Sequence, residues 1–135
     1  MADGIKKVQH FRTTVEDRPG MLAEITKGLA DAGVNLLYIG GWPAGGGQAT
    51  IACVPEDPDT FKSLAAQHGI SLEEDTGFLY ECGDRVGALC DIAAKLGDAG
   101  INIYAVQGLA AGGQCAAILT VRAEDVGKAA QALGV

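Results

Sequence analysis

The first part of the chain changes from a strand-like to a helix-like spacing of apolar residues. Gln9–Glu16 is rich in β-branched and aromatic residues, a composition that favours a strand. Apolar residues then recur at three- and four-residue intervals, at Leu22, Ile25 and Leu29. This spacing predicts a helix with one buried face. We expect Pro19 at the first helical position, because its fixed φ suits a helix start, and we expect Gly33 to end the helix.

Further elements follow at short intervals. The pattern predicts a strand at Val34–Ile39, a loop at Gly40–Gly47, a strand at Gln48–Val54, a helix at Pro58–Gln67 and a short strand at Ile70–Glu74. In the second helix the inward residues are expected to be Phe61, Leu64 and Ala65. The order β-α-β-β-α-β is the ferredoxin-like arrangement, an α+β fold with helices on one face of an antiparallel sheet.

The sequence then repeats itself. Asp17–Leu22 recurs 67 residues later as Asp84–Leu89, and Asp31–Leu36 recurs at the same offset as Asp98–Ile103. Two matched blocks in one order at a constant offset indicate a duplication. We therefore expect two tandem ferredoxin-like domains, at 1–75 and 76–135, separated only by the residues around Asp75.

The second repeat is expected to be shorter than the first. Its predicted elements are Gly77–Cys82, Gly87–Ala99, Ile101–Gln107, Gln114–Val121 and Ala123–Leu133. The sequence ends at Val135, the position that corresponds to Ile70 at the start of the first repeat's fourth strand. The second repeat therefore lacks its fourth strand, and we expect Gly77–Cys82 to be an unpaired sheet edge.

Two short motifs carry a family resemblance. Asp-Arg-Pro-Gly-x-Leu at the first strand–helix turn, followed by Ala-Gly-Val-Asn-Leu at the helix–strand turn, resembles the signature of ACT domains, regulatory modules of enzymes in amino-acid metabolism. The resemblance implies that modules lie side by side and bind an effector amino acid at their seam. It assigns the ligand to a set of turn and strand positions, namely Asp17, Arg18, Pro19, Gly20, Met21, Leu22, Asn35, Leu36, Asp84, Arg85, Val86, Gly87, Ala88, Leu89, Asn102 and Ile103.

The residue types at these positions suit an amino acid, but they also have structural explanations. A glycine at a helix start lets a ligand approach the backbone, and the N–H groups there favour a carboxylate. Asp17, Asp84 or the asparagine amides are acceptors for an ammonium group. Alternatively, both aspartates cap helices, and Asn35 and Asn102 only follow a left-handed turn. Val86 replaces the proline of the first repeat, so we expect the two sites to be unequal.

Charge and cysteine usage exclude several classes of protein. The net charge of −7 and the pI near 4.6 argue against nucleic acid as a partner. No apolar run is long enough for a membrane span, and the N-terminal residues lack the apolar region of a signal peptide, so we expect a cytoplasmic protein. We expect the four cysteines to be free buried thiols. Without C-x-x-C spacing, and with two histidines, neither a metal nor a cofactor is expected.

Two rival functions remain beside amino-acid sensing. A small enzyme needs a nucleophile beside a base, but His10 and His68 have no counterparts in the second repeat, and Cys82 with Cys90 is favoured as packing rather than a redox pair. A ligand-free interaction module is the other alternative. We predict a non-catalytic protein that binds a small amino acid and acts through a partner enzyme or regulator.

The strands also predict self-association. Ala116–Val121 is apolar on both faces. Around it, Ile101, Ile103 and Ala105 are expected to face the helices, and the outer face is expected to carry Tyr104, Val106, Leu37 and Ile39. An exposed apolar face of this kind usually marks an interface, so we expect a homodimer.

Overall fold

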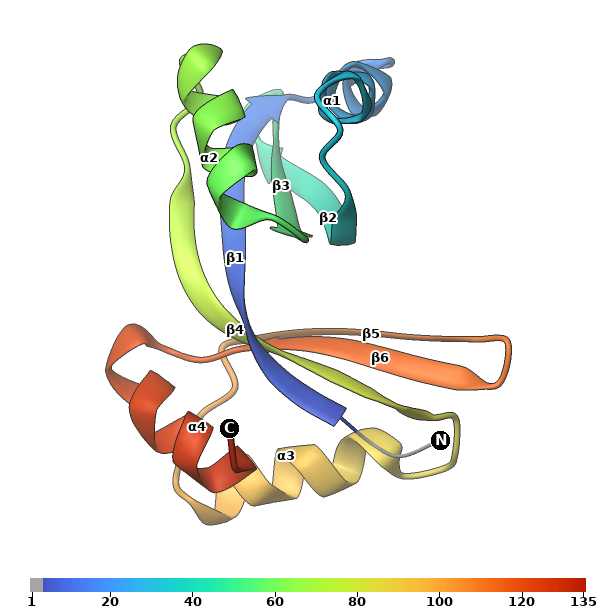
Figure 1. Ribbon diagram of the computed structural model, residues 1–135, viewed down its shortest axis with the longest axis vertical. Coiled ribbons are helices and arrows are strands. Elements are labelled where there is room, and N and C mark those ends of the chain that lie inside the picture. The colour runs from blue at the N-terminus through green and yellow to red at the C-terminus, as the bar shows by residue number, and fades with distance from the viewer. Residues whose placement is uncertain (1–3) are drawn as a thin grey trace. The chain divides into compact units, whose positions relative to one another are not determined.

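The computed structural model describes residues 4–135 of the chain (Figure 1). Met1–Asp3, the start of the expected first domain, lie outside the described residues. The elements, in chain order, are β1 (Gly4–Glu16), α1 (Met21–Asp31), β2 (Leu36–Gly45), β3 (Gln48–Pro55), α2 (Pro58–Gln67), β4 (Glu73–Gly83), α3 (Ala88–Asp98), β5 (Ala105–Ala111), β6 (Gln114–Thr120), a 3-10 turn (Ala123–Asp125) and α4 (Val126–Leu133). They form two compact units: residues 9–74, called the first module, and residues 4–8 with 75–135, called the second module.

The first module has the predicted α+β architecture. β3 lies between β2 and β1 and runs antiparallel to both, and β4 begins on the other side of β1. On the helix-covered face, Phe11 of β1 lies opposite Cys53 of β3, and the Phe11 ring contacts Phe61 of α2 at a centroid distance of 5.0 Å. Leu29 of α1 completes this small core with Val34.

The second module repeats this topology with a larger core. β6 lies between β4 and β5 and runs antiparallel to both. Its buried cluster takes residues from β4, from β6, from the connecting segments at Ile101 and Val121 and from both helices: Phe78, Tyr80, Cys82, Ala88, Ile92, Leu96, Ile101, Ala117, Leu119, Val121, Ala129, Ala130 and Leu133. The apolar stripe of each helix therefore faces the sheet, as the spacing in the sequence predicts.

The place of the missing fourth strand is filled from the N-terminal side. β1 begins at Gly4 rather than at Gln9, and its first residues belong to the second module beside β4. Ile5 packs against the core of that module, and a side chain added at Gly77 would lie 3.7 Å from Val8. The prediction of an unpaired edge at Gly77–Cys82 was therefore wrong.

Several predicted boundaries were also wrong. The two strands predicted at Ile70–Glu74 and Gly77–Cys82 are one strand, β4, so Asp75 lies inside a strand. β2 continues to Gly45 through most of the predicted loop Gly40–Gly47. β5 begins at Ala105, not at Ile101, because Ile101 closes the end of α3 with a hydrogen bond from its N–H to the Leu96 carbonyl (2.9 Å).

These shifts change which side chains face the helices. Ile39 lies opposite Cys53, and Val106 lies opposite Leu119, so both face the helices and not the outer side as predicted. Ala105 lies opposite Thr120 and faces outward, where the sequence predicted the reverse. Side chains alternate between the two faces along a strand, so misplacing the start of a strand by one residue moves every predicted side chain to the opposite face. A register shift such as that between Leu36 and Tyr38 has the same effect.

Within residues 4–135, none of the helices is long and apolar enough to span a membrane.

α2 has a side-chain cap that provides a test of this helix. Asp57 Oδ1 accepts hydrogen bonds from the backbone N–H groups of Asp59 (3.2 Å) and Thr60 (3.3 Å), and Oδ2 accepts one from the Thr60 hydroxyl (2.7 Å). These bonds, the one from the hydroxyl foremost, lower the pKa of Asp57. Asp57→Ala is expected to lower the melting temperature by a few degrees, because the first N–H groups of the helix lose their acceptor.

The pH dependence follows from the direction of that shift. A carboxylate whose pKa falls on folding stabilises the protein above its unfolded pKa, and this contribution disappears as the pH falls through the folded pKa. The difference in melting temperature between wild type and Asp57→Ala should therefore shrink in acid. Asp125, the N-cap of α4, makes no side-chain cap hydrogen bond. Asp125→Ala should have little effect, and an equal loss in both variants would contradict the assignment.

Candidate functional site

The same turn leads into the first helix of each module. Gly20 and Gly87 occupy the N-cap positions of α1 and α3, with φ of 87° and 86°, in the left-handed region that side chains other than glycine rarely adopt. Neither helix start has a side-chain cap. The alternative that Asp17 and Asp84 cap the helices was therefore wrong, and α1 starts at Met21 rather than at Pro19. The N–H groups of Met21 and Ala88 donate to the carbonyls of Arg18 and Arg85 (3.3 Å each), and the next two N–H groups of each helix, at residues 22–23 and 89–90, are left for an anion.

Each turn is anchored to the neighbouring hairpin through its aspartate. The backbone N–H of Asp17 donates to the carbonyl of Gly47 (2.9 Å), and that of Asp84 donates to the carbonyl of Gly113 (3.0 Å). Gly47 and Gly113 lie at the tips of the β2–β3 and β5–β6 hairpins and have positive φ. The duplicated sequence therefore builds the same turn, held in the same way, twice.

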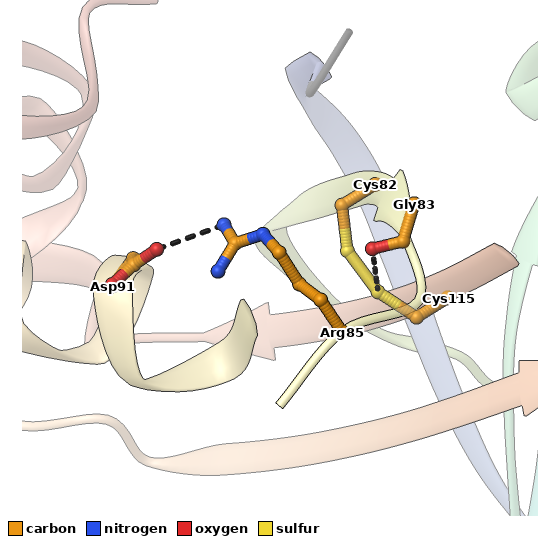
Figure 2. Close-up of a disulfide and its surroundings, with 5 residues drawn as sticks. All are labelled: Cys82, Gly83, Arg85, Asp91 and Cys115. Atoms are coloured by element: carbon orange, nitrogen blue, oxygen red, sulfur yellow. Dashed lines mark hydrogen bonds and ion pairs between the residues drawn. A yellow bond between two sulfur atoms is a disulfide. The ribbon is translucent and has the colours of Figure 1, made fainter. Parts of the chain in front are cut away.

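An arginine and an acidic residue form an ion pair across each turn. Arg18 Nη2 lies 2.6 Å from Glu24 Oε2, and Arg85 Nη2 lies 2.8 Å from Asp91 Oδ2 (Figure 2). The hydrogen bond to Glu24 is the main cause of the raised pKa of Arg18. All four side chains are exposed by more than a third, so these pairs add little to stability. They place a cation and an anion beside the uncapped helix start.

The asparagines lie at the other end of the helix. Asn35 Nδ2 donates to Glu56 Oε2 (2.7 Å), and the N–H of Glu56 donates to the Asn35 carbonyl (2.9 Å). Leu36 lies opposite Pro55, at the C-terminal end of β3. The turn lies near the N-terminal end of β3, where Gln48 pairs with Glu16. Within one module, therefore, the structure does not bring the turn and the asparagine together.

The second module shows the same separation. Asn102 and Ile103 follow the C-terminal end of α3, whereas Gly87 precedes its N-terminal end. Ile103 packs against the core, as Leu36 does in the first module. The left-handed conformation falls on Gly33 and Gly100, with φ of 72° and 74°, so Asn35 and Asn102 follow such a turn without adopting positive φ themselves.

Comparison with known proteins decides the family of the first module. Residues 11–73 match the family model of the ACT domain. This segment of the chain is an ACT domain. ACT domains are regulatory modules, so the chain contains a regulatory module. None of the curated proteins compared by sequence matches the chain.

Solved structures share the fold of both modules together. The protein BT0572 from Bacteroides thetaiotaomicron is similar with a TM-score of 0.82 at 18% identity, over 96% of this chain and 88% of that one. The ligand-free regulatory subunit of aspartate kinase from Thermus thermophilus is similar with a TM-score of 0.65 at 15% identity, over 98% of this chain and 94% of that one. At these identities the likeness establishes the fold alone, an α+β fold of two ferredoxin-like modules.

The remaining predicted ligand positions divide into exposed and buried ones. Arg18 and Pro19 are exposed in the first ACT turn, and Met21 is half-buried. Leu22, predicted on the buried face of α1, is 57% exposed, so that prediction was wrong. In the second turn Val86 is fully exposed, Leu89 is 41% exposed and Ala88 is buried. Both helix starts thus present apolar side chains to solvent beside the uncapped N–H groups.

A disulfide stands directly before the second turn. Cys82 of β4 and Cys115 of β6 lie opposite each other and are joined, and Cys115 Sγ lies 3.9 Å from the Gly83 carbonyl oxygen (Figure 2). The prediction of four free buried thiols was therefore wrong for this pair and for Cys90, which is exposed. Cys53 is free and buried, and burial raises its pKa to about 12.

The sequence contained a signal for this pair. The repeat aligns Cys82 with Val15 and Cys115 with Ala49, and Val15 lies opposite Ala49 in the first ACT domain. Placing the predicted strands of the first repeat in register would have brought the two cysteines together.

Proposed function

We propose that this chain is a non-catalytic regulatory protein that binds a small amino acid between ACT modules of two chains. One observation carries the proposal: both modules build the same glycine turn, at φ of 87° and 86°, with no side-chain cap on the helix that follows. Glycine is an accepted N-cap residue, but it has no side chain to bond the helix N–H groups, so a ligand can approach them. The ACT family match of residues 11–73 supports the same function.

The turn offers groups for both charges of an amino acid. The uncapped N–H groups at the start of α1 suit the carboxylate, because the helix dipole is positive there. Glu24, which pairs with Arg18, and the amide oxygen of Asn35 are acceptors for the ammonium group. The same groups recur around Gly87, with Asp91 and Arg85 as the pair.

The separation of turn and asparagine within a module argues for a site that needs two chains. If two chains pair their β2 edges about a two-fold axis, their α1 helices run antiparallel. The turn at Gly20 of one chain then lies beside Asn35 of the other. β2 and β5 are edge strands, and they carry exposed apolar residues such as Trp42 (41%) and Leu109 (76%). Such edges are normally covered, which supports a homodimer.

A thermal-shift screen against the twenty amino acids tests the function. A ligand present at 100 times its Kd is expected to add about 2.7 kcal/mol of apparent stability. We expect one or a few small amino acids to raise the melting temperature and Gly20→Leu/Gly87→Leu to abolish the shift. A flat screen with a dimeric protein would instead favour a ligand-free interaction module, and a turnover lost on changing one side chain would favour an enzyme.

A further inference from the structure

We propose that the first module holds a second binding site, which borders the turn at Met21 and Glu24, for a small uncharged apolar molecule. A cavity of about 670 Å³ lies between α1, α2 and the sheet of this module, and it opens to solvent. This volume falls within the roughly 300–1,000 Å³ of typical small-molecule sites. Its apolar lining comes from all three surfaces: Phe11 and Ile51 from the sheet, Ile25 and Leu29 from α1, and Phe61 and Leu64 from α2.

The second module provides an internal comparison for this place in the fold. Ile92 and Leu96 of α3 stand 67 residues after Ile25 and Leu29 and are 1% and 0% exposed. α3 and α4 pack against each other over their sheet, and both contribute to one buried cluster (Figure 1). In the first module Ile25 is only partly buried and lines the cavity. Ile92 also borders a cavity, of about 610 Å³, but Asp91 and Lys95 contribute to its lining, so that cavity is more polar than the one beside Ile25.

Two sequence differences distinguish the cavity of the first module from its counterpart in the second. The N–H of Ile70 donates to the Ala65 carbonyl at the end of α2, and the N–H of Val135 donates to the Ala130 carbonyl at the end of α4. These equivalent hydrogen bonds show which residues of the two helices correspond. In that alignment His68 stands where the second module has Leu133, which is 8% exposed within its core. In α1, Gly28 lines the cavity, and a β-carbon added there would meet nothing within 4 Å. The first cavity thus lacks the Leu133 and Lys95 side chains that line its counterpart in the second module.

The lining decides the chemistry of the ligand. The charged groups at the rim already have partners: Arg12 lies 2.9 Å from Glu73, and Glu24 pairs with Arg18. Thr13 donates its hydroxyl to the Ser71 carbonyl (2.9 Å), and Cys53 is a neutral thiol at physiological pH because burial raises its pKa to about 12. A charged ligand would lose its hydration without gaining a counter-ion here. An uncharged hydrocarbon or aromatic body matches the lining.

The uncharged fluorophore N-phenyl-1-naphthylamine tests the site, because its emission rises on entering an apolar cavity. We expect saturable binding to the wild type and at least about a tenfold weaker affinity for Gly28→Leu, whose side chain fills the cavity. Gly97→Leu is the matched control, since Gly97 is also a helical glycine with nothing within 4 Å of an added β-carbon and does not line the cavity. It should bind the probe as the wild type does.

Further measurements separate the possible outcomes. Ile25→Phe, a second variant that fills the cavity, should lower the affinity for the probe in the same way. Circular dichroism should show that both variants are folded. The amino-acid thermal shift should persist in Gly28→Leu, which separates this site from the turn. The proposal is overturned if the wild type shows no saturable binding, if both filling variants bind as the wild type does, or if probe binding falls as protein concentration rises because a second chain occupies the cavity.

Discussion

Reduction of the Cys82–Cys115 disulfide is expected to lower the free energy of unfolding by about 3–4 kcal/mol. The two cysteines are 33 residues apart in the sequence, so the bond closes a long loop and lowers the conformational entropy of the unfolded chain. Urea denaturation with and without a dithiol reductant measures the difference. Thiol titration of the unfolded, unreduced protein should find two of the four cysteines, Cys53 and Cys90.

The first module supplies the matched variant for this experiment. Cys82→Val/Cys115→Ala places there the pair that the first module carries at Val15 and Ala49. This variant should show the stability of the reduced wild type and no response to reductant, because its side chains already pack in that geometry in the same chain. Cys90→Ser, at an exposed position, should leave the reductant effect unchanged. Four titratable thiols in the unreduced protein would show that the bond does not form.

Local signals in the sequence predicted the elements that depend on neighbouring residues. α2 begins at Pro58 and ends at Gln67, as predicted, because Asp57 caps it and Pro58 suits the first helical position. The inward positions Phe61 and Ala65 are buried, since the helical spacing alone fixes which side faces the sheet. The order of elements was correct for the same reason.

Strand limits were less predictable because they depend on partners far away in the sequence. The two adjacent lysines Lys6 and Lys7 gave no strand signal, yet β1 extends to Gly4 because β4 lies beside it. β4 runs through Asp75, although aspartate is depleted in strands. The strand continues there because its first residues belong to the first module and the rest belongs to the second. Tertiary pairing thus overrides local preference at both sites.

The motif located the turns but not their relation to the asparagines. Gly20 and Gly87 were predictable because a repeated Asp-Arg-x-Gly before a helix needs a special backbone conformation at the glycine. The cavity in the first module was not predictable, because Ile25 and Ile92 are the same residue in the same pattern. Only the packing around them leaves Ile25 partly exposed and Ile92 buried.

Mixing two inactive variants is expected to restore amino-acid binding, if turn and asparagine come from different chains. One variant, Gly20→Leu/Gly87→Leu, blocks both turns, because leucine at these positive φ values strains the backbone and fills the approach to the N–H groups. The other, Asn35→Ala/Asn102→Ala, removes both side-chain amides. Each alone should lose affinity on the order of 100-fold, since hydrogen bonds to a charged ligand are among the strongest.

Refolding the two variants together forms mixed dimers in which one seam has both defects and the other has neither. We therefore expect binding to return at wild-type affinity, at roughly half of the sites of each mixed dimer, as two-fold symmetry requires. Calorimetry measures affinity and site number, and differential tags with light scattering count the mixed dimers. Asp125→Ala in both chains is the neutral control, because Asp125 caps α4 without a side-chain bond. Mixed dimers that form but bind no amino acid would place turn and asparagine in one chain, which the opposite ends of α1 make geometrically unfavourable.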